Sequence, residues 1–155
     1  MYTGNSKLDF ISIHSMSRAF SLCEEKYNKK TFSHSLRVAE YAVSNALCEN
    51  SFADFVYAVA ILHDIIEDSD VTVKQIGDIF GNIAFEGKTI GECVNCLTHD
   101  KEKETYEEYI IRVKNNNHAV VYLVKLADMK DHFMQTETLT DKLREKYLNA
   151  IGYLL

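Results

Sequence analysis

The sequence predicts an all-α protein, a single-domain helical bundle over residues 1–155. The chain has 155 residues with no proline and only six glycines. Long helices tolerate that composition better than the many turns of a β-protein do. Apolar residues recur at helical spacing along most of the chain, and the sequence shows no linker, repeat or low-complexity segment.

The first half of the chain predicts three helices. The apolar pattern indicates a helix over about residues 8–27. A second helix is expected to begin at Ser33, whose hydroxyl suits an N-cap. Residues 52–66 are apolar on nearly every side, which is typical of a central buried helix. A polar break follows that helix at 67–70.

The second half continues the helical pattern. Thr72 is expected to cap a short helix that Gly81 ends. Residues 82–88 are expected to be irregular, and we find no convincing pair of strands. The remaining helices are expected near 88–98, 103–116, 118–133 and 139–154. The β-branched residues of 118–133 alone would fit a strand, but the length of that segment favours a helix.

Charge and composition narrow the function. The chain carries 17 Lys and Arg against 23 Asp and Glu, a formal net charge of -6. This acidic balance argues against a general nucleic-acid binder but leaves room for a small anionic substrate. No apolar run approaches the roughly 20 residues that span a bilayer. The N-terminus does not resemble a signal peptide, so we expect a cytoplasmic protein with no membrane partner and four reduced cysteines.

The most informative polar residues follow the most apolar stretch. His63 and Asp64 end this stretch directly, and on a helix His63 would share a face with Glu67 and Asp64 with Asp68. Burying carboxylates without partners costs several kcal/mol. A divalent cation is a natural partner for an adjacent imidazole and carboxylate. The alternative is a helix cap, or a histidine held by a carboxylate.

Two other apolar helices carry similar intrusions, His34 and Asp128. Each alone is more often a satisfied core residue or a helix-end group, but together with His63 and Asp64 they indicate a metal site. Lys125 lies within the same apolar run as Asp128, and Arg37 follows His34 by one turn. Both cations are candidates for neutralising an anionic substrate.

These residues resemble a known family. The ordered set of His34, the His63-Asp64 pair and Asp128 resembles the HD-domain superfamily of metal-dependent phosphohydrolases. The segments LHDIIEDSDVT, IGDIFG and VKLAD look more specifically like the hydrolase domain of RelA/SpoT-type alarmone enzymes, over about residues 30–155. Because the other regions of the long enzymes would not fit in this length, the resemblance is to a small stand-alone hydrolase.

The resemblance implies roles for individual residues. The implied ligands of one divalent ion are His34, His63, Asp64 and Asp128. That ion is Mn²⁺ first, with Fe²⁺, Ni²⁺, Zn²⁺ or Mg²⁺ as the other choices. Glu67 and Asp68 match the pair that acts on the nucleophilic water, and the sequence does not rank them. Thr98 matches a threonine of the family and is a substrate-side candidate.

Two positions depart from the family's pattern. Ser35 follows His34 where the family typically has proline, and His132 stands where it usually has an asparagine that helps hold the nucleotide sugar. His132 is therefore a substrate-side candidate. We expect cleavage of a phosphoester or pyrophosphate in a nucleotide-like substrate, with guanosine 3',5'-bis(diphosphate) 3'-pyrophosphohydrolase as the closest named activity. The alternatives are a nucleoside-monophosphate phosphatase of the same chemistry and a non-catalytic nucleotide- or metal-binding regulatory module. The oligomeric state stays open.

Overall fold

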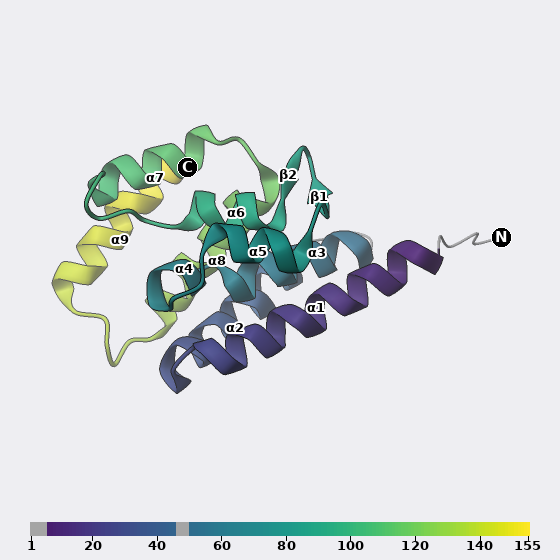
Figure 1. The fold of residues 1–155 in the computed structure, drawn as a ribbon. Coiled ribbons are helices and arrows are strands. Elements are labelled where there is room, and N and C mark those ends of the chain that lie inside the picture. Colours follow the sequence, from purple (N-terminus) through teal and green to yellow (C-terminus); the bar gives the residue numbers. More distant parts are fainter. Residues whose placement is uncertain (1–5, 46–49) are drawn as a thin grey trace.

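Helices dominate the computed structural model of the chain, which describes residues 6–45 and 50–155 (Figure 1). The helices are α1 (Ser6–Lys26), α2 (Lys29–Asn45), α3 (Asn50–Leu62), α4 (Ile65–Asp68), α5 (Val73–Phe80), α6 (Ile90–Leu97), α7 (Tyr106–Asn115), α8 (Ala119–Met134) and α9 (Asp141–Leu154). A short hairpin, β1 (Ala84–Phe85) and β2 (Lys88–Thr89), leads into α6. The predicted all-α fold is confirmed.

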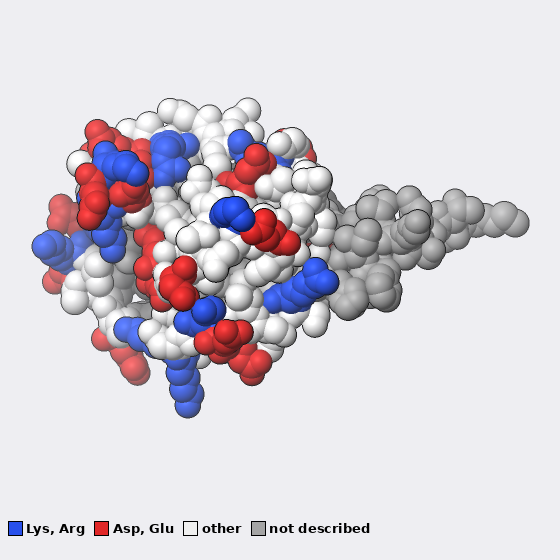
Figure 2. All heavy atoms as spheres, in the orientation of Figure 1, with Lys and Arg blue, Asp and Glu red and all other residues white. Residues whose placement is uncertain are grey.

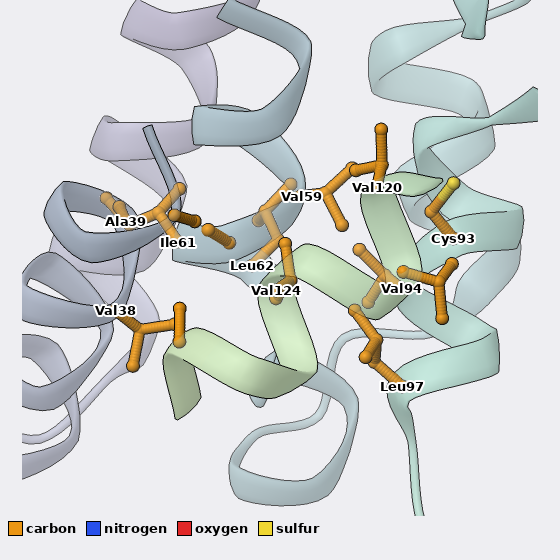
Figure 3. Packing of buried hydrophobic residues seen from close by; sticks show 14 of the residues in the cluster. Val38, Ala39, Val59, Ile61, Leu62, Cys93, Val94, Leu97, Val120 and Val124 are labelled. Atoms are coloured by element: carbon orange, nitrogen blue, oxygen red, sulfur yellow. The ribbon is translucent and has the colours of Figure 1, made fainter. Parts of the chain in front are cut away.

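Helix α3 lies at the centre of the core. It packs against α1, α2, α6 and α8. All five residues from Ala58 to Leu62 are fully buried, as expected of a helix that is apolar on nearly every side. Figure 3 shows Val38 of α2, Leu62 of α3, Val94 of α6 and Val124 of α8 among the side chains of this core. The core fixes α2, the end of α3 and α8 relative to one another.

Threonine caps fix where several helices begin. The Thr72 hydroxyl accepts from the Gln75 amide at the start of α5, and Gly81 ends that helix with a φ of 61°. Both residues were predicted in these positions. Thr89 and Thr105 form the same reciprocal capping box with a glutamate three residues on, which satisfies amide groups that have no partner within the helix.

Two predicted details of the first helices are wrong. Helix α2 begins at Lys29, because the side-chain oxygen of Asn28 accepts from the Thr31 amide at 2.8 Å and takes the capping role assigned to Ser33. The helix predicted over 52–66 is also not continuous. Helix α3 ends at Leu62, and His63 and Asp64 form a turn before α4.

The hairpin corrects the prediction that 82–88 is irregular. Its antiparallel strands pair Ala84 with Thr89 and Phe85 with Lys88. Glu86 and Gly87 form the turn with φ values of 46° and 79°, as two-residue hairpins require. The Phe85 ring packs 4.7 Å from that of Phe52 in α3. The sequence signal is weak because each strand has two residues and glutamate rarely adopts a positive φ.

Both signs of charge are mixed on one face of the molecule. On the face drawn in Figure 2, acidic and basic side chains are interspersed over the described residues. Such a pattern differs from the basic stripe of a general nucleic-acid binder. Within residues 6–45 and 50–155, no helix combines the length and the apolar character needed to cross a membrane.

The cysteines within the described residues are free thiols: Cys23, Cys93 and Cys96. Cys23 is buried in α1 and donates to the carbonyl oxygen of Ile61 at 3.2 Å. Burial raises the pKa of the Cys23 thiol to about 12, which keeps it protonated and unreactive. The fourth cysteine, Cys48, lies outside the described residues.

Candidate metal centre

Three separate parts of the chain bring two histidines and two aspartates together. His34 comes from α2, His63 and Asp64 from the turn after α3, and Asp128 from α8. The Nε2 atom of His34 lies 3.5 Å from Asp64 Oδ2 and 3.2 Å from Asp128 Oδ1. The Nε2 atom of His63 lies 3.2 Å and 3.6 Å from the same two oxygens. The four residues implied by the resemblance therefore form one cluster.

The break after α3 shapes this cluster. Adjacent side chains on a continuous α-helix diverge by about 100° around its axis. Because His63 and Asp64 lie in a turn, the imidazole and the carboxylate converge to within 3.2 Å. The predicted helical pairing of His63 with Glu67 does not describe this geometry. In the turn, His63 instead contacts its sequence neighbour Asp64.

Two buried nitrogens in the cluster are orphaned. The Nε2 atoms of His34 and His63 have no hydrogen-bond partner of suitable geometry, although carboxylate oxygens lie nearby. Their Nδ1 atoms contact Asp131 Oδ2 and the Ala60 carbonyl oxygen, each at 2.7 Å. Because those two oxygens accept here, each Nδ1 donates, and Nε2 remains the nitrogen that binds a proton or a cation.

The electrostatic environment of the cluster favours the charged forms of its histidines and aspartates. Burial opposes ionisation of both histidines, but the carboxylates of Asp64 and Asp128 outweigh it and raise the pKa of His34 and His63. Burial likewise opposes ionisation of Asp128, yet Lys125 and the imidazoles hold its pKa well below the usual range. The carboxylates are thus ionised at neutral pH, and a cation would compete with protons for the imidazole nitrogens.

This donor set fits a divalent metal ion. One ligand atom from each of His34, His63 and Asp64 lies within 4.8 Å of the others, and so does one from each of His34, Asp128 and His132. Imidazole nitrogens with carboxylate oxygens are the ligands of Mn²⁺, Fe²⁺, Ni²⁺ and Zn²⁺ sites. The orphaned nitrogens are those that such an ion would satisfy.

Lys125 contacts the cluster through Asp128. Its ammonium is buried and donates to Asp128 Oδ2 at 2.8 Å, while Asp128 Oδ1 faces the histidines. The Tyr109 ring lies 4.9 Å from the same ammonium. The sequence suggested that Lys125 neutralises a substrate, but its observed contact is with Asp128. The lysine balances and orients that carboxylate.

Asp131 is the residue of the site that the sequence analysis missed. Its carboxylate is fully buried and accepts from Arg37 Nε at 2.7 Å and Nη2 at 3.0 Å, as well as from His34. Arg37, predicted on the substrate side, therefore uses its guanidinium to hold Asp131. The available signal was a second aspartate three residues after Asp128, on the same side of α8.

Glu67 and Asp68 lie on α4 and face different hollows. Asp68 lines a hollow of about 590 Å³ together with His34, Asp64 and His132. Glu67 lines a neighbouring hollow with Thr98, whose hydroxyl donates to the Val94 carbonyl oxygen at 2.9 Å.

The environment of each carboxyl sets its pKa. The Glu67 side chain is exposed at the rim of its hollow, but partial burial and the charge of Asp64 raise its pKa to about 7, against the opposing charge of Lys125. Burial and Asp64 also raise the pKa of Asp68, while the Thr31 hydroxyl, which donates to Asp68 at 3.5 Å, opposes the rise. Burial and the charge of Asp64 thus raise the pKa of both carboxyls.

His132 lies at the edge of the cluster. Its Nε2 atom is 3.1 Å from Asp128 Oδ1, and its ring stacks on that of Tyr147 in α9 with the centroids 4.6 Å apart. The side chain is 37% exposed and lines the same hollow as Asp68. His132 therefore lines the hollow, as predicted for a substrate-side residue, and also contacts the candidate ligand Asp128.

Comparisons with known proteins show which proteins the chain resembles. The GTP pyrophosphokinase rsh of Brucella ovis and that of Brucella suis biovar 1 are each 33% identical to the chain over an alignment of 113 residues. Each match covers 68% of this chain and 14% of the relative. The chain thus matches a small part of these long proteins. A solved structure described as "A metazoan ortholog of SpoT hydrolyzes ppGpp and plays a role in starvation responses" shares the fold, with a TM-score of 0.67 and 18% identity over 99% of this chain and 85% of that chain.

The family model described as HD domain matches residues 31–151. The match covers most of the chain and extends from α2, before His34, into α9. It therefore includes each segment that contributes to the cluster of histidines and aspartates. The chain belongs to the HD domain family.

Proposed function

We propose that the chain is a metal-dependent phosphohydrolase that cleaves a phosphoester or pyrophosphate bond of a nucleotide-like substrate, with residues 1–155 as one domain. The observation that carries this proposal is the pair of buried, orphaned Nε2 atoms of His34 and His63, which lie within 3.6 Å of two carboxylates. Buried polar atoms without partners are rare in folded proteins and call for an explanation. Membership of the HD domain family supports a metal as that explanation.

The proposed ligands of the ion are His34, His63, Asp64 and Asp128. Mn²⁺ is our first choice, with Fe²⁺, Ni²⁺, Zn²⁺ or Mg²⁺ as the others. A divalent ion held there would lower the pKa of a water molecule and polarise a phosphoryl oxygen. Lys125 and Asp131 would keep Asp128 and His34 in their binding orientations, because each contacts its partner within 2.8 Å.

We propose Glu67 as the general base, with Asp68, which faces the hollow beside the candidate ligands, as the alternative. A base is most effective when its pKa lies near the working pH, and the raised pKa of Glu67 meets that condition. Its carboxylate would accept a proton from the attacking water. Asp68 faces the hollow that His34 and Asp64 also line, where its carboxylate would orient that water or a substrate hydroxyl.

The hollow next to the candidate ligands is the proposed substrate site. Lys30, Arg37, His132 and Tyr147 are among the residues that line it, so it offers cations for phosphate groups and a stacked pair of rings. The first candidate substrate is guanosine 3',5'-bis(diphosphate), because the SpoT ortholog that shares the fold is described as hydrolysing ppGpp. A nucleoside monophosphate is the second, because His132 replaces the asparagine expected to hold the nucleotide sugar.

The test combines elemental analysis of protein purified without chelators with a screen for phosphate and pyrophosphate release from nucleotides in added Mn²⁺. We expect about one transition metal ion per chain and release of pyrophosphate from guanosine 3',5'-bis(diphosphate). Phosphate released from mononucleotides would keep the mechanism and change the substrate. Protein that binds the ion without any turnover would be a regulatory binding module, and protein that binds no ion would overturn the proposal.

A further inference from the structure

We propose that His132 is a fifth protein ligand of the same ion, so that the site offers three imidazoles and two carboxylates. The inference rests on the proposed metal site and deepens it. It moves His132 from the substrate to the metal, and it predicts which ions the site prefers. The chemistry implied is that of a nitrogen-rich centre.

The His132 nitrogen lies next to the carboxylate oxygen that the other histidines face. Asp128 Oδ1 lies 3.1 Å from His132 Nε2 and 3.2 Å from His34 Nε2. The three ligand atoms are within 4.8 Å of one another, the same limit that His34, His63 and Asp64 satisfy. His34 belongs to both groups. The His132 nitrogen is therefore as close to the shared oxygen as the nitrogen of an expected ligand is.

The His132 ring is also held in place. Asp128 and His132 are four residues apart on α8 and share a face of that helix. The Tyr147 ring stacks on the imidazole with an interplanar angle of 14°, and the His34 ring lies 5.1 Å away. Ligands whose rotamers are fixed by neighbouring side chains bind an ion without a further ordering cost.

A role as a simple counter-charge explains His132 less well. Asp128 already has a buried cationic partner, because Lys125 donates to its Oδ2 atom at 2.8 Å. The Oδ1 atom that faces His132 is the same oxygen that faces His34 and His63. Three imidazole nitrogens that converge on one carboxylate oxygen are the arrangement expected around a cation that binds all of them.

A third imidazole ligand would change which metal ion the site prefers. Imidazole nitrogen favours Ni²⁺, Zn²⁺, Cu²⁺ and Fe²⁺, whereas oxygen ligands suit Mn²⁺ and Mg²⁺. An asparagine at position 132 would offer at most an amide oxygen. The third imidazole should therefore strengthen binding of Ni²⁺ more than binding of Mn²⁺.

The direct experiment is X-ray absorption spectroscopy of the Ni²⁺-loaded full chain, which counts coordinated imidazoles. We expect three imidazoles in the unaltered protein, and two would overturn the proposal. Isothermal titration calorimetry with Ni²⁺ and Mn²⁺ then compares three variants. In His132→Asn we expect the Ni²⁺ Kd to rise at least roughly tenfold, the lower end of what even a supporting residue of a metal site contributes, and the Mn²⁺ Kd to rise less.

His132→Phe separates coordination from stacking, because phenylalanine keeps a ring against Tyr147 and removes the nitrogen. We expect it to lose Ni²⁺ affinity as His132→Asn does; retained affinity in His132→Phe would overturn the proposal. Gln135→Ala is the control, since Gln135 lines the same hollow but offers no imidazole. An unaltered protein that binds one ion with two imidazoles would overturn this inference alone. One that binds no ion would overturn the proposed function as well.

Discussion

Two polar clusters in this chain hold charged groups, and they differ in whether their hydrogen bonds are complete. In the first, Arg112 of α7 donates to both oxygens of Glu104 at 2.9 Å and 2.6 Å. It also donates to the carbonyl oxygens of Cys96 and Thr98, each at 2.9 Å. In the second, His34 and His63 keep buried Nε2 atoms without a hydrogen-bond partner.

The difference separates a structural network from a binding site. A guanidinium surrounded by four acceptors has little left to offer a ligand, so the Arg112 cluster ties α6 to α7. The histidine cluster leaves its orphaned nitrogens and the two carboxylates directed at one another. Desolvating such groups is costly unless something else binds them. The incomplete cluster is the one expected to recognise an ion.

The largest effect should come from removing a proposed ligand. We expect Asp64→Asn to lose the ion and, with it, more than roughly 10³-fold in turnover, because water is a poor nucleophile until a metal lowers its pKa. Elemental analysis and a pyrophosphate-release assay measure both losses. Circular dichroism checks the fold. A variant that keeps its ion and its turnover would remove Asp64 from the site.

Glu67→Gln tests the proposed base without touching a proposed ligand. We expect kcat to fall by roughly 10²–10⁴-fold, the usual contribution of a positioned acid or base, while the ion content stays unchanged. Glu40→Gln, on the exposed surface of α2, is the matched control. Equal activity in the two variants would assign the proton transfer to another group, with Asp68 as the next to test.

Asp131→Asn tests how far the incomplete cluster depends on its support. The change weakens the acceptor that holds Arg37 and His34, so the imidazole should be less well oriented. We expect ion affinity to fall by about 10–100-fold, as for other supporting residues of metal sites. Turnover should return when excess ion is added. If the Kd for the ion does not change, Asp131 serves the fold and not the site.

The pH profile gives a smaller and graded effect. The pKa of Glu67 is raised to about 7, so protonation removes the base as the pH falls through that value. A bound cation favours the carboxylate and moves the acid limb of kcat/KM to or below pH 7. Below the limb, activity should fall about tenfold per pH unit. Glu67→Gln should lack this limb, and a limb that persists there belongs to another group.

The sequence predicted the helices better than it predicted their ends. Helical periodicity in the apolar residues follows from local geometry, so the order of helices and the Thr72 cap were visible. The break after Leu62 was not, because Ile65 and Ile66 continue the apolar pattern beyond His63 and Asp64. Ser33 was chosen as a cap by residue type, while Asn28 competed for the same role five residues earlier.

Contacts between residues far apart in the sequence also limit how much of the candidate site the sequence can predict. The sequence identified four candidate ligands because polar residues within apolar helices are unusual: His34, His63, Asp64 and Asp128. Asp131 also interrupts an apolar helix, but its partners His34 and Arg37 are 97 and 94 residues away in the sequence. No local pattern reports such a contact. Which oxygen of Asp128 meets Lys125, and which meets the histidines, likewise depends on how α2, α3 and α8 pack.

The final prediction concerns the Arg112 cluster, whose hydrogen bonds are complete. Changing it should affect ion binding at the histidine site less than any variant above. Arg112→Ala leaves Glu104 and two carbonyl oxygens without their donor, and hydrogen bonds to charged groups contribute about 1.5–3 kcal/mol each. Because the Arg112 side chain is 40% exposed and water replaces part of the loss, we expect the free energy of unfolding to fall by about 1–2 kcal/mol. Urea unfolding measures this change. Arg112→Lys, which keeps the charge but not the planar set of donors, should recover only part of it.

The same two variants should bind Ni²⁺ or Mn²⁺ as the unaltered chain does, since Arg112 contacts neither the histidines nor Asp128 through any of its four hydrogen bonds. Calorimetry without urea, at a temperature where both variants are fully folded, makes that comparison independent of stability. A loss of ion affinity equal to that of Asp131→Asn would mean that the complete cluster also positions the site, through Thr98 and the hollow it shares with Glu67. Unchanged affinity with lowered stability would show that the two clusters divide folding and binding between them.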